Sequence, residues 1–421
     1  MNGSISRFWK EEAFMKQELL YERGDLFDVN MIITMIVRVK GSASEEEWKT
    51  AFGKAVRANE ILLTRICIEE DGRAYYTDGN SIGSSLRFTE EDLQKVRQRE
   101  ERIRFRIEEG EYIRVFVKPE GEETSVLFLM HHLGGDGKSL LYFIEGFLTF
   151  LSGGSVPFRE IRTEETKENL DFISRGIIRY YNRRWKKRTF SFEDMDRAYE
   201  RYWKDRTTTI KTEVIEEAEM ERIKDECRRN GVRFTSYLTA KLIRADSEQK
   251  KTKDIGYALD YRHDGNRSMG NQASGCSVRY RYNPHKSLME NALEIQKRLD
   301  RKLTDHQKGS YILSFVSKIT PTLHDAVNLE HAGTFHDKIS YRFAKLMGYV
   351  GRTKDYSITN LTVADIPVTY GSFEIKEILF AGPVISYGQR IISVITCNGR
   401  TVITTHFREK ETEKTDAFRT K

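Results

Sequence analysis

The chain has 421 residues, more than a single hydrophobic core usually accommodates, which predicts two packed halves of about 200 residues each. Hydrophobic residues make up 38% of the chain and aromatic residues 11%, which excludes a disordered protein, and six prolines are too few for a Pro-rich linker. Lys and Arg number 70 against 64 Asp and Glu, an excess too small to indicate nucleic-acid binding by itself.

Targeting and redox features predict a reduced, soluble, cytoplasmic protein. The first 20 residues lack the apolar stretch of a signal peptide, and no run reaches the roughly 18 apolar residues of a membrane span. The cysteines lie far apart without CxxC spacing, which argues against a disulfide framework or a zinc knuckle. The histidines outside residues 131–132 have no carboxylate spaced to complete a metal site, so no metal is predicted.

Residues 1–154 are expected to form one α/β half. The β-branched run 29–39 predicts a strand, and Ser44 with Glu47 forms a capping box that opens a helix to about residue 58. Asp71 and Gly72 predict a hairpin between strands at 62–68 and 74–77. Thr89 with Asp92 predicts the start of a charged helix towards residue 99, and strands at 112–117 and 125–130 follow.

The end of this half combines a buried strand, a Gly-rich turn and a buried helix. Residues 126–130 show no polar alternation, so both faces of that strand are expected to be covered. The string His-His-Leu-Gly-Gly-Asp-Gly occupies residues 131–137, and an apolar helix runs from residue 138 to about residue 151, ended by Ser-Gly-Gly at 152–154. Such a setting presents the polar residues of the turn in a cleft.

Residues 155–206 predict a charged crossover segment, and residues 207–407 a second α/β half with a similar order of elements. Strands are expected at 208–214, 255–261, 357–361, 372–380, 391–397 and 401–407, and helices at 216–229, 235–245, 288–303, 310–328 and 335–346. The tail 408–421 is charged, lacks periodicity and is expected to be frayed.

The histidine pair is the strongest chemical signal in the chain. Successive residues at a strand end point in opposite directions, so His131 and His132 cannot share one role. One faces the core or the turn, and the other faces a cleft, where imidazole can act as a general base near neutral pH. A lone histidine in such a turn is more often a structural group. The complete string, in which the turn folds Asp136 back beside the imidazoles, favours a catalytic role.

The string resembles the HHxxxDG motif of the chloramphenicol acetyltransferase-like superfamily, which includes nonribosomal peptide condensation domains, alcohol acyltransferases and polyketide-associated acyltransferases. Residues 59–66, Asn-Glu-Ile-Leu-Leu-Thr-Arg-Ile, resemble a degraded form of the condensation-domain pattern RHExLRTxF. Residues 260–262 resemble the D-x-R segment, residues 270–271 the Gly-Asn that follows it, and residues 357–361 the S-x-S-N-x-G strand. The DFGWG motif of plant-type acyltransferases is absent.

The resemblance implies an α/β fold of two acetyltransferase-like halves that form a V-shaped pseudo-dimer with an active-site tunnel between them. It implies that His132 is the general base of an acyltransferase and that Asp136 is a structural aspartate paired with an arginine. That arginine is Arg262, Arg65 or neither, because residue 63 is leucine where the pattern has arginine.

The resemblance also places His131 and Gly137 at the tunnel, with Gly137 allowing close backbone approach. Ser357 and Asn360 would lie opposite His132, where they either stabilise an oxyanion or simply face water.

The expected reaction transfers an acyl group from a thioester to a small hydroxyl or amine acceptor, forming an ester or an amide. The thioester, on coenzyme A or on a phosphopantetheine arm, is a co-substrate, and no bound cofactor is expected. The alternative is a non-catalytic, condensation-like domain that binds a carrier protein or another partner.

Two further patterns in the chain resemble binding motifs of other kinds. The run 134–139 approaches a phosphate-binding P-loop, but His132 occupies the position where that loop requires glycine. Residues 175–188 contain arginines, lysines and aromatics but no acid, which could serve a carrier protein, coenzyme A phosphates or nucleic acid. The solvated face of a crossover helix is the favoured interpretation, so nucleic acid is not the expected partner.

Overall fold

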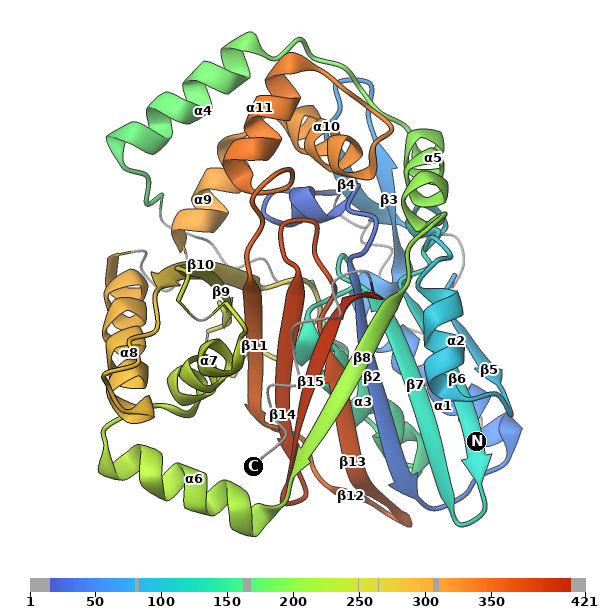
Figure 1. Ribbon diagram of the computed structural model, residues 1–421. Helices are drawn as coiled ribbons and strands as arrows, with labels where there is room; N and C mark the ends of the chain where they lie inside the picture. Colours follow the sequence, from blue (N-terminus) through green and yellow to red (C-terminus); the bar gives the residue numbers. More distant parts are fainter. Residues whose placement is uncertain are drawn as a thin grey trace.

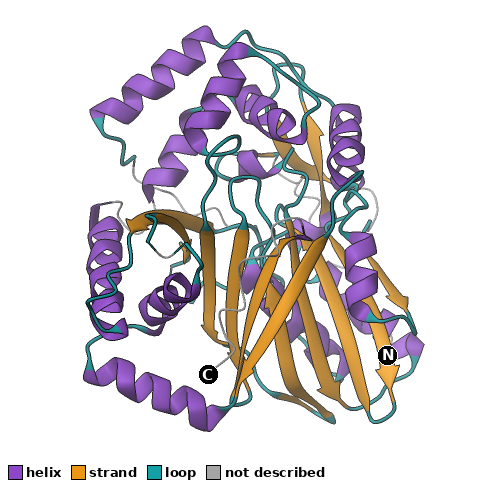
Figure 2. Ribbon diagram, in the orientation of Figure 1, coloured by secondary structure: helices purple, strands orange, loops and turns teal. Residues whose placement is uncertain are grey.

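The computed structural model describes residues 16–79, 83–161, 168–248, 250–263, 265–305 and 310–409 (Figure 1). Within these ranges the strands form two six-stranded sheets and one three-stranded sheet, with helices packed around them (Figure 2). The mixed α/β architecture agrees with the fold class that the sequence predicts.

The first large sheet has the order β12-β13-β2-β7-β6-β5. Its centre consists of β2 (Ile32–Lys40), β7 (Glu123–His131) and β6 (Ile113–Glu120), which are antiparallel neighbours, and β5 (Ser85–Phe88) lies parallel to β6. The helices α1 (Glu45–Arg57) and α3 (Gly137–Leu151) contact each other, and α2 (Leu93–Glu100) contacts β7. The capping box of Ser44 and Glu47 at the start of α1 is confirmed. Residues 126–130 of β7 are at most 1% exposed, so the expectation that both faces are covered is also confirmed.

The second large sheet has the order β10-β9-β11-β14-β15-β8. Its strands are β10 (Ala273–Tyr280), β9 (Lys253–Asp260), β11 (Tyr356–Val363), β14 (Arg390–Cys397), β15 (Arg400–Arg408) and β8 (Thr208–Ile215). The helices α6 (Glu217–Arg229), α7 (Phe234–Ala245) and α8 (Leu288–Asp305) contribute buried residues to a separate core with this sheet. Every strand of this sheet except β10 was among those that the sequence predicts.

The two sheets exchange strands. Both β12 (Thr369–Tyr370) and β13 (Phe373–Ala381) come from the second half of the chain, yet β13 pairs with β2, with Ala381 opposite Thr34. Its apolar side chains, among them Ile375, Ile378 and Phe380, are buried in the core of the first sheet. The chain then returns to the second sheet as β14. The region 207–407 therefore contributes strands to both sheets. The sequence does not predict this exchange, because an alternating pattern indicates a strand but not the sheet that the strand joins.

A layer of helices covers one end of the molecule (upper part of Figure 1). It contains α4 (Phe172–Arg184), α5 (Phe192–Trp203), α9 (Ser310–Lys318), α10 (Pro321–Ala332) and α11 (Lys338–Met347). The prediction of one helix over 310–328 is wrong. The helix breaks before Pro321, which occupies the first turn of α10, since proline lacks the N–H that a continuous helix needs.

A third, small sheet consists of β1 (Gln17–Glu18), β4 (Ala74–Asp78) and β3 (Thr64–Ile68). The hairpin between β3 and β4 turns at Gly72, whose φ of 82° suits glycine. Of the tail, residues 410–421 lie outside the described residues, and Arg408 ends β15. No helix in the described ranges is both long and apolar enough to span a membrane.

Candidate active site

The residues of the histidine string lie at the junction of β7 and α3. β7 ends at His131, a turn carries residues 132–135, and Asp136 is the N-cap of α3, accepting a hydrogen bond from the Ser139 N–H at 3.0 Å. The backbone N–H of His132 donates to the Met31 carbonyl at 2.8 Å, which ties the turn to the start of β2. Hydrogen bonds therefore fix the turn at both of its ends.

His131 is the histidine that faces the core. Its side chain is fully buried, and its Nδ1 accepts a hydrogen bond from the Leu133 N–H at 3.1 Å. Burial, with smaller contributions from the neighbouring His132 and two arginines, lowers the pKa of His131 to about 3. His131 is therefore neutral and stabilises the turn. Its ring packs near the ring of Phe105.

His132 keeps 13% of its side chain exposed, and Nδ1 is not part of that exposed surface. This nitrogen lies 3.7 Å from Oδ2 of Asp25 and has no hydrogen-bond partner at shorter range. Burial lowers the pKa of His132 to about 4, against the opposing influence of the Asp136 charge and of its own backbone carbonyl. The imidazole is therefore neutral near pH 7, the form that accepts a proton.

Asp136 does not contact His132 but forms a bidentate ion pair with Arg262, with N–O distances of 2.7 and 2.9 Å. It also accepts the Gln272 N–H at 3.0 Å. Burial raises the pKa of Asp136, but the Arg262 guanidinium and the hydrogen bonds outweigh it, so the pKa lies below its usual value. Arg262 also donates to Ser139 Oγ at 2.7 Å. This cluster joins the start of α3 to the segment that links β9 and β10.

The other arginine candidate lies elsewhere. Arg65 is exposed on β3, and its Nε donates to the Asp78 carbonyl at 3.3 Å. Gly137 begins α3 in a tight space, because a Cβ at this residue would lie 3.0 Å from the ring of Phe380 and 3.2 Å from Leu361. A glycine therefore allows β11 and β13 to approach the start of α3 closely.

The two polar residues of β11 named by the sequence have other surroundings than His132. The side-chain amide of Asn360 donates to Thr235 Oγ1 at 3.1 Å and accepts the Thr362 N–H at 2.8 Å, so it is engaged towards α7. The next residue, Leu361, is the one that lies against Gly137. Ser357 lies earlier on the strand, and its hydroxyl is buried without a hydrogen-bond partner. No contact of either Ser357 or Asn360 with His132 is present among the described residues.

Asp25 was missed by sequence reasoning. It ends the short 3-10 helix η1 (Glu22–Asp25), and its Oδ2 accepts a hydrogen bond from the Asn271 side chain at 2.7 Å. Burial and the nearby Asp28 raise the pKa of Asp25 well above its usual value, opposed by the Asn271 hydrogen bond. Asp25 stands in an ordinary charged stretch of sequence, so no pattern distinguished it.

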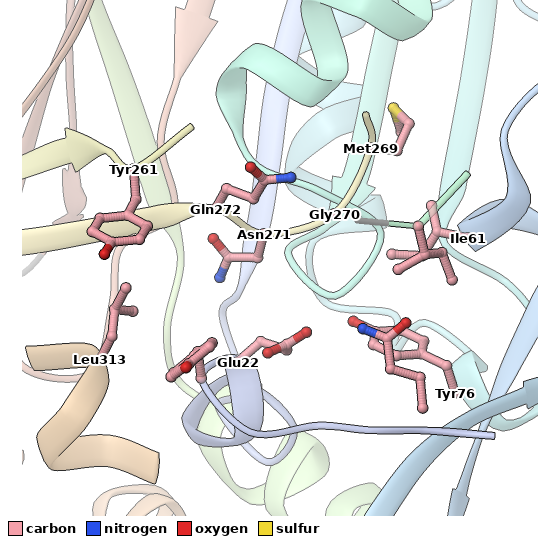
Figure 3. Close-up of a pocket in the computed structure, with 12 residues that line it drawn as sticks. Glu22, Ile61, Tyr76, Tyr261, Met269, Gly270, Asn271, Gln272 and Leu313 are labelled. Carbon is pink, nitrogen blue, oxygen red and sulfur yellow. The ribbon is translucent and has the colours of Figure 1, made fainter. Parts of the chain in front are cut away.

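A small pocket, partly open to solvent, borders the same segment. Figure 3 shows Tyr261 and Leu313 at one end, Ile61 and Tyr76 at the other, and Asn271 between them. Glu22 of η1 also lines it, and burial raises the pKa of that carboxyl to about 6. Asn271 lines the pocket and donates to Asp25, so these two side chains connect the pocket to His132. No group of three metal-binding side chains occurs in the described part of the chain.

Comparisons with known proteins define the class of fold. No family model and no curated protein matches the sequence. Solved structures do match over nearly the whole chain. The first condensation domain of the CDA synthetase shares 12% identity over 94% of this chain and 91% of its own, with a TM-score of 0.61. The trichothecene 15-O-acetyltransferase of Fusarium sporotrichioides shares 11% identity over 94% and 90%, with a TM-score of 0.64.

An epimerization domain from tyrocidine synthetase B also matches, at 13% identity over 96% and 93% of the two chains, with a TM-score of 0.59. The protein thus has the two-part α/β fold that these condensation, acetyltransferase and epimerization domains share. The neighbours include condensation, acetyltransferase and epimerization domains, so the particular reaction depends on the site and not on the fold.

Proposed function

We propose that the protein is an acyltransferase that moves an acyl group from a thioester to a hydroxyl or amine acceptor, with His132 as the general base. The observation that carries the proposal is the neutral, partly exposed imidazole of His132 on a turn that Asp136 and Arg262 hold rigid. Transferase-type neighbours with the same fold support it.

The proposed reaction needs two proton transfers, and His132 carries out both. His132 takes the proton from the acceptor O–H or N–H, and the acceptor heteroatom forms a bond to the thioester carbonyl carbon. The tetrahedral oxyanion then collapses, the C–S bond breaks, and the leaving thiolate receives the proton from the imidazolium. Both substrates meet in one site, so no acyl-enzyme forms, and the product is an ester or an amide.

Asp25 would hold the imidazole of His132 in the tautomer that a general base needs. Its carboxyl oxygen lies on the Nδ1 side of the imidazole, and Asn271 anchors it there. A hydrogen on Nδ1 that points to Asp25 leaves the lone pair on Nε2, the nitrogen that would face the acceptor. Asp136 cannot do this, because Arg262 occupies both of its oxygens.

The donor would be acyl-coenzyme A or a phosphopantetheinyl thioester, used as a co-substrate rather than a bound cofactor. A matching starter condensation domain of rhizomide synthetase was solved with C8-CoA, at 10% identity and a TM-score of 0.59. A small alcohol or amine is the proposed acceptor, and an acyl or peptidyl carrier protein is the partner if the thioester is carrier-bound.

Thiol release from acetyl-coenzyme A and longer acyl-coenzyme A donors tests the proposal. Wild type and His132→Ala are compared across a panel of alcohols and amines. Release that requires an acceptor and falls at least about 100-fold in His132→Ala would support general-base acyl transfer. Equal release by both proteins would exclude His132 as the base.

A non-catalytic, condensation-like binding domain is the second candidate. The side-chain amide of Asn360 faces Thr235, while the apolar Leu361 lies against Gly137, which leaves fewer oxyanion donors than an acyltransferase would use. Absence of thiol release with coenzyme A and carrier-bound donors alike, together with retained binding of a loaded carrier protein, would favour this candidate.

A further inference from the structure

Two neighbouring helices outside the candidate active site present an unusual outer face. The helices α4 and α11 pack against each other through Tyr181 and Phe343, whose ring centroids are 4.8 Å apart. Each helix buries a narrow stripe, which includes Ser174 and Ile178 on α4, and most of its other residues are exposed or half-buried. Both helices lie at the end of the molecule opposite α6 (Figure 1).

This α4–α11 face is strongly cationic. Its basic residues are Arg175, Arg179, Arg183, Arg184, Lys338, Arg342 and Lys345, and neither helix contains Asp or Glu. Arg175 pairs with Glu168, and Arg184 lies over the Tyr180 ring at 4.7 Å. Within the described ranges, the other five cations have no carboxylate partner. Their charge is therefore available to an external anionic surface.

The same face exposes large apolar side chains. Phe172 is 89% exposed and Ile173 is 72% exposed at the start of α4, and Leu346 of α11 is 54% exposed. Tyr180 and Tyr341 are also exposed, so five of the nine exposed large hydrophobic residues in the described ranges belong to these two helices. Leaving such residues in water is unfavourable, and their concentration on one face indicates an interaction site.

We propose that the α4–α11 face docks the protein onto an anionic lipid surface. Apolar and aromatic side chains that alternate with Lys and Arg on surface helices are typical of segments that lie in the headgroup region. The apolar tips enter the interface one by one, while the cations remain among the lipid phosphates. An acidic protein could satisfy the charges, but it would need a matching pocket for each separate apolar side chain. The inference does not depend on acyl transfer.

Vesicle sedimentation with the full chain tests this proposal. The probe is a vesicle of phosphatidylcholine and phosphatidylserine at about three to one, compared with phosphatidylcholine alone. We expect binding to the anionic vesicle that weakens as salt rises, because salt screens the charges. Arg179→Glu with Arg183→Glu should weaken binding at least about tenfold. Phe172→Ser with Ile173→Ser should also weaken it, and both pairs are exposed, so folding is retained.

A matched control lies at the opposite end of the molecule. Arg222→Glu with Arg229→Glu on the exposed side of α6 gives the same change in net charge and should leave binding unchanged. Equal loss in this control, or no preference for the anionic vesicle, would overturn the proposal. Loss on charge reversal with no effect of the Phe172 and Ile173 changes would also overturn it, and an acidic protein would then fit the surface better.

Discussion

At the scale of single residues, the two carboxylates near the histidine pair have different tasks. Asp136 belongs to the histidine string, but it is fully engaged with Arg262, so it positions the start of α3. Asp25 comes from η1 and is the carboxylate that lies beside His132. Burial and the nearby Asp28 raise the pKa of Asp25 well above the ordinary value.

Asp25→Asn should change the pH dependence of acyl transfer. A carboxylate beside Nδ1 stabilises the imidazolium, so wild-type kcat/KM should rise with pH as Asp25 ionises at its raised pKa. The asparagine variant should lose this rise and about 10- to 1000-fold of the rate, since the imidazolium loses its counter-charge. The measurements are the pH profile of kcat/KM and the nitrogen chemical shifts of His132, which report its tautomer without any substrate.

Other ionisable groups facing Asp25 are Glu22, Asp28, Tyr76, Tyr349 and Tyr387. Glu22 is the decisive control, because burial raises its pKa to about 6 and it lies on the same short helix. Glu22→Gln removes a charge that raises the pKa of Asp25, so the rise of kcat/KM with pH should remain but move to lower pH, and the His132 shifts should stay close to wild type. If Glu22→Gln removes the rise with pH and Asp25→Asn does not, Asp25 is not the group that controls the base.

The residue scale also shows what a single sequence can predict of the site. The histidine string predicted the strand-turn-helix setting of His132 and Asp136 because all its residues are local. Arg262 was one of two candidates, since spacing alone does not say which distant arginine folds back to Asp136. Asp25 was missed because its proximity to His132 arises from the tertiary fold.

At the scale of elements, the cluster of Asp136 and Arg262 joins the two halves of the molecule at the site. It connects the N-terminus of α3 to the segment after β9, where the Gly270 carbonyl accepts from Ser139 Oγ at 2.8 Å. A single backbone bridge between Gly135 and Gly270 runs alongside. The geometry of the turn that carries His132 therefore depends on residues more than 120 positions away.

Arg262→Ala should destabilise the protein by about 3 to 5 kcal/mol, because it leaves the buried Asp136 without its counter-charge. Arg262→Lys keeps the charge but loses the bidentate geometry, so a smaller loss of stability is expected. Denaturant unfolding of both variants measures the difference, with the exposed Arg65→Ala as the control that should change stability by less than about 1 kcal/mol. Equal stability of Arg262→Ala and wild type would contradict a structural role.

The elements themselves were largely predictable where periodicity and caps were local. The capping box at Ser44, the hairpin at Gly72 and the apolar α3 all followed from short-range patterns. The break between α9 and α10 was missed although Pro321 signals it, because apolar spacing continues across the break. Periodicity alone cannot distinguish one long amphipathic helix from two that turn at a proline.

At the scale of the whole molecule, two features tie the halves together beyond the site. The strand β13 adds a segment of the second half to the first sheet. A buried ion cluster forms the second tie, in which Glu101, after α2, pairs with Arg97 at 2.6 Å and lies 3.4 Å from His406 of β15. Thr208 of β8 donates to the same carboxylate. Neither tie could be predicted from the sequence, since both pair residues that are distant along the chain.

The Glu101 cluster predicts how the stability of the whole molecule depends on pH. Burial raises the pKa of Glu101, but the Arg97 charge and His406 outweigh burial and lower it to about 2. The folded pKa lies below the ordinary value of 4.5, so the stabilisation is present above about pH 4.5 and is lost as pH falls towards 2. A difference of this size corresponds to stabilisation on the order of 3 kcal/mol at neutral pH.

Glu101→Gln should remove that stabilisation at neutral pH and flatten the decline of the free energy of unfolding between about pH 5 and 2. Denaturant unfolding across this range, beside wild type, is the measurement. Glu91→Gln is the matched control, since Glu91 forms an exposed ion pair with Arg99 and should contribute less than about 1 kcal/mol. If Glu101→Gln and Glu91→Gln have the same small effect, the cluster between α2 and β15 does not hold the halves together, and β13 and the Asp136–Arg262 pair remain as the connections that do.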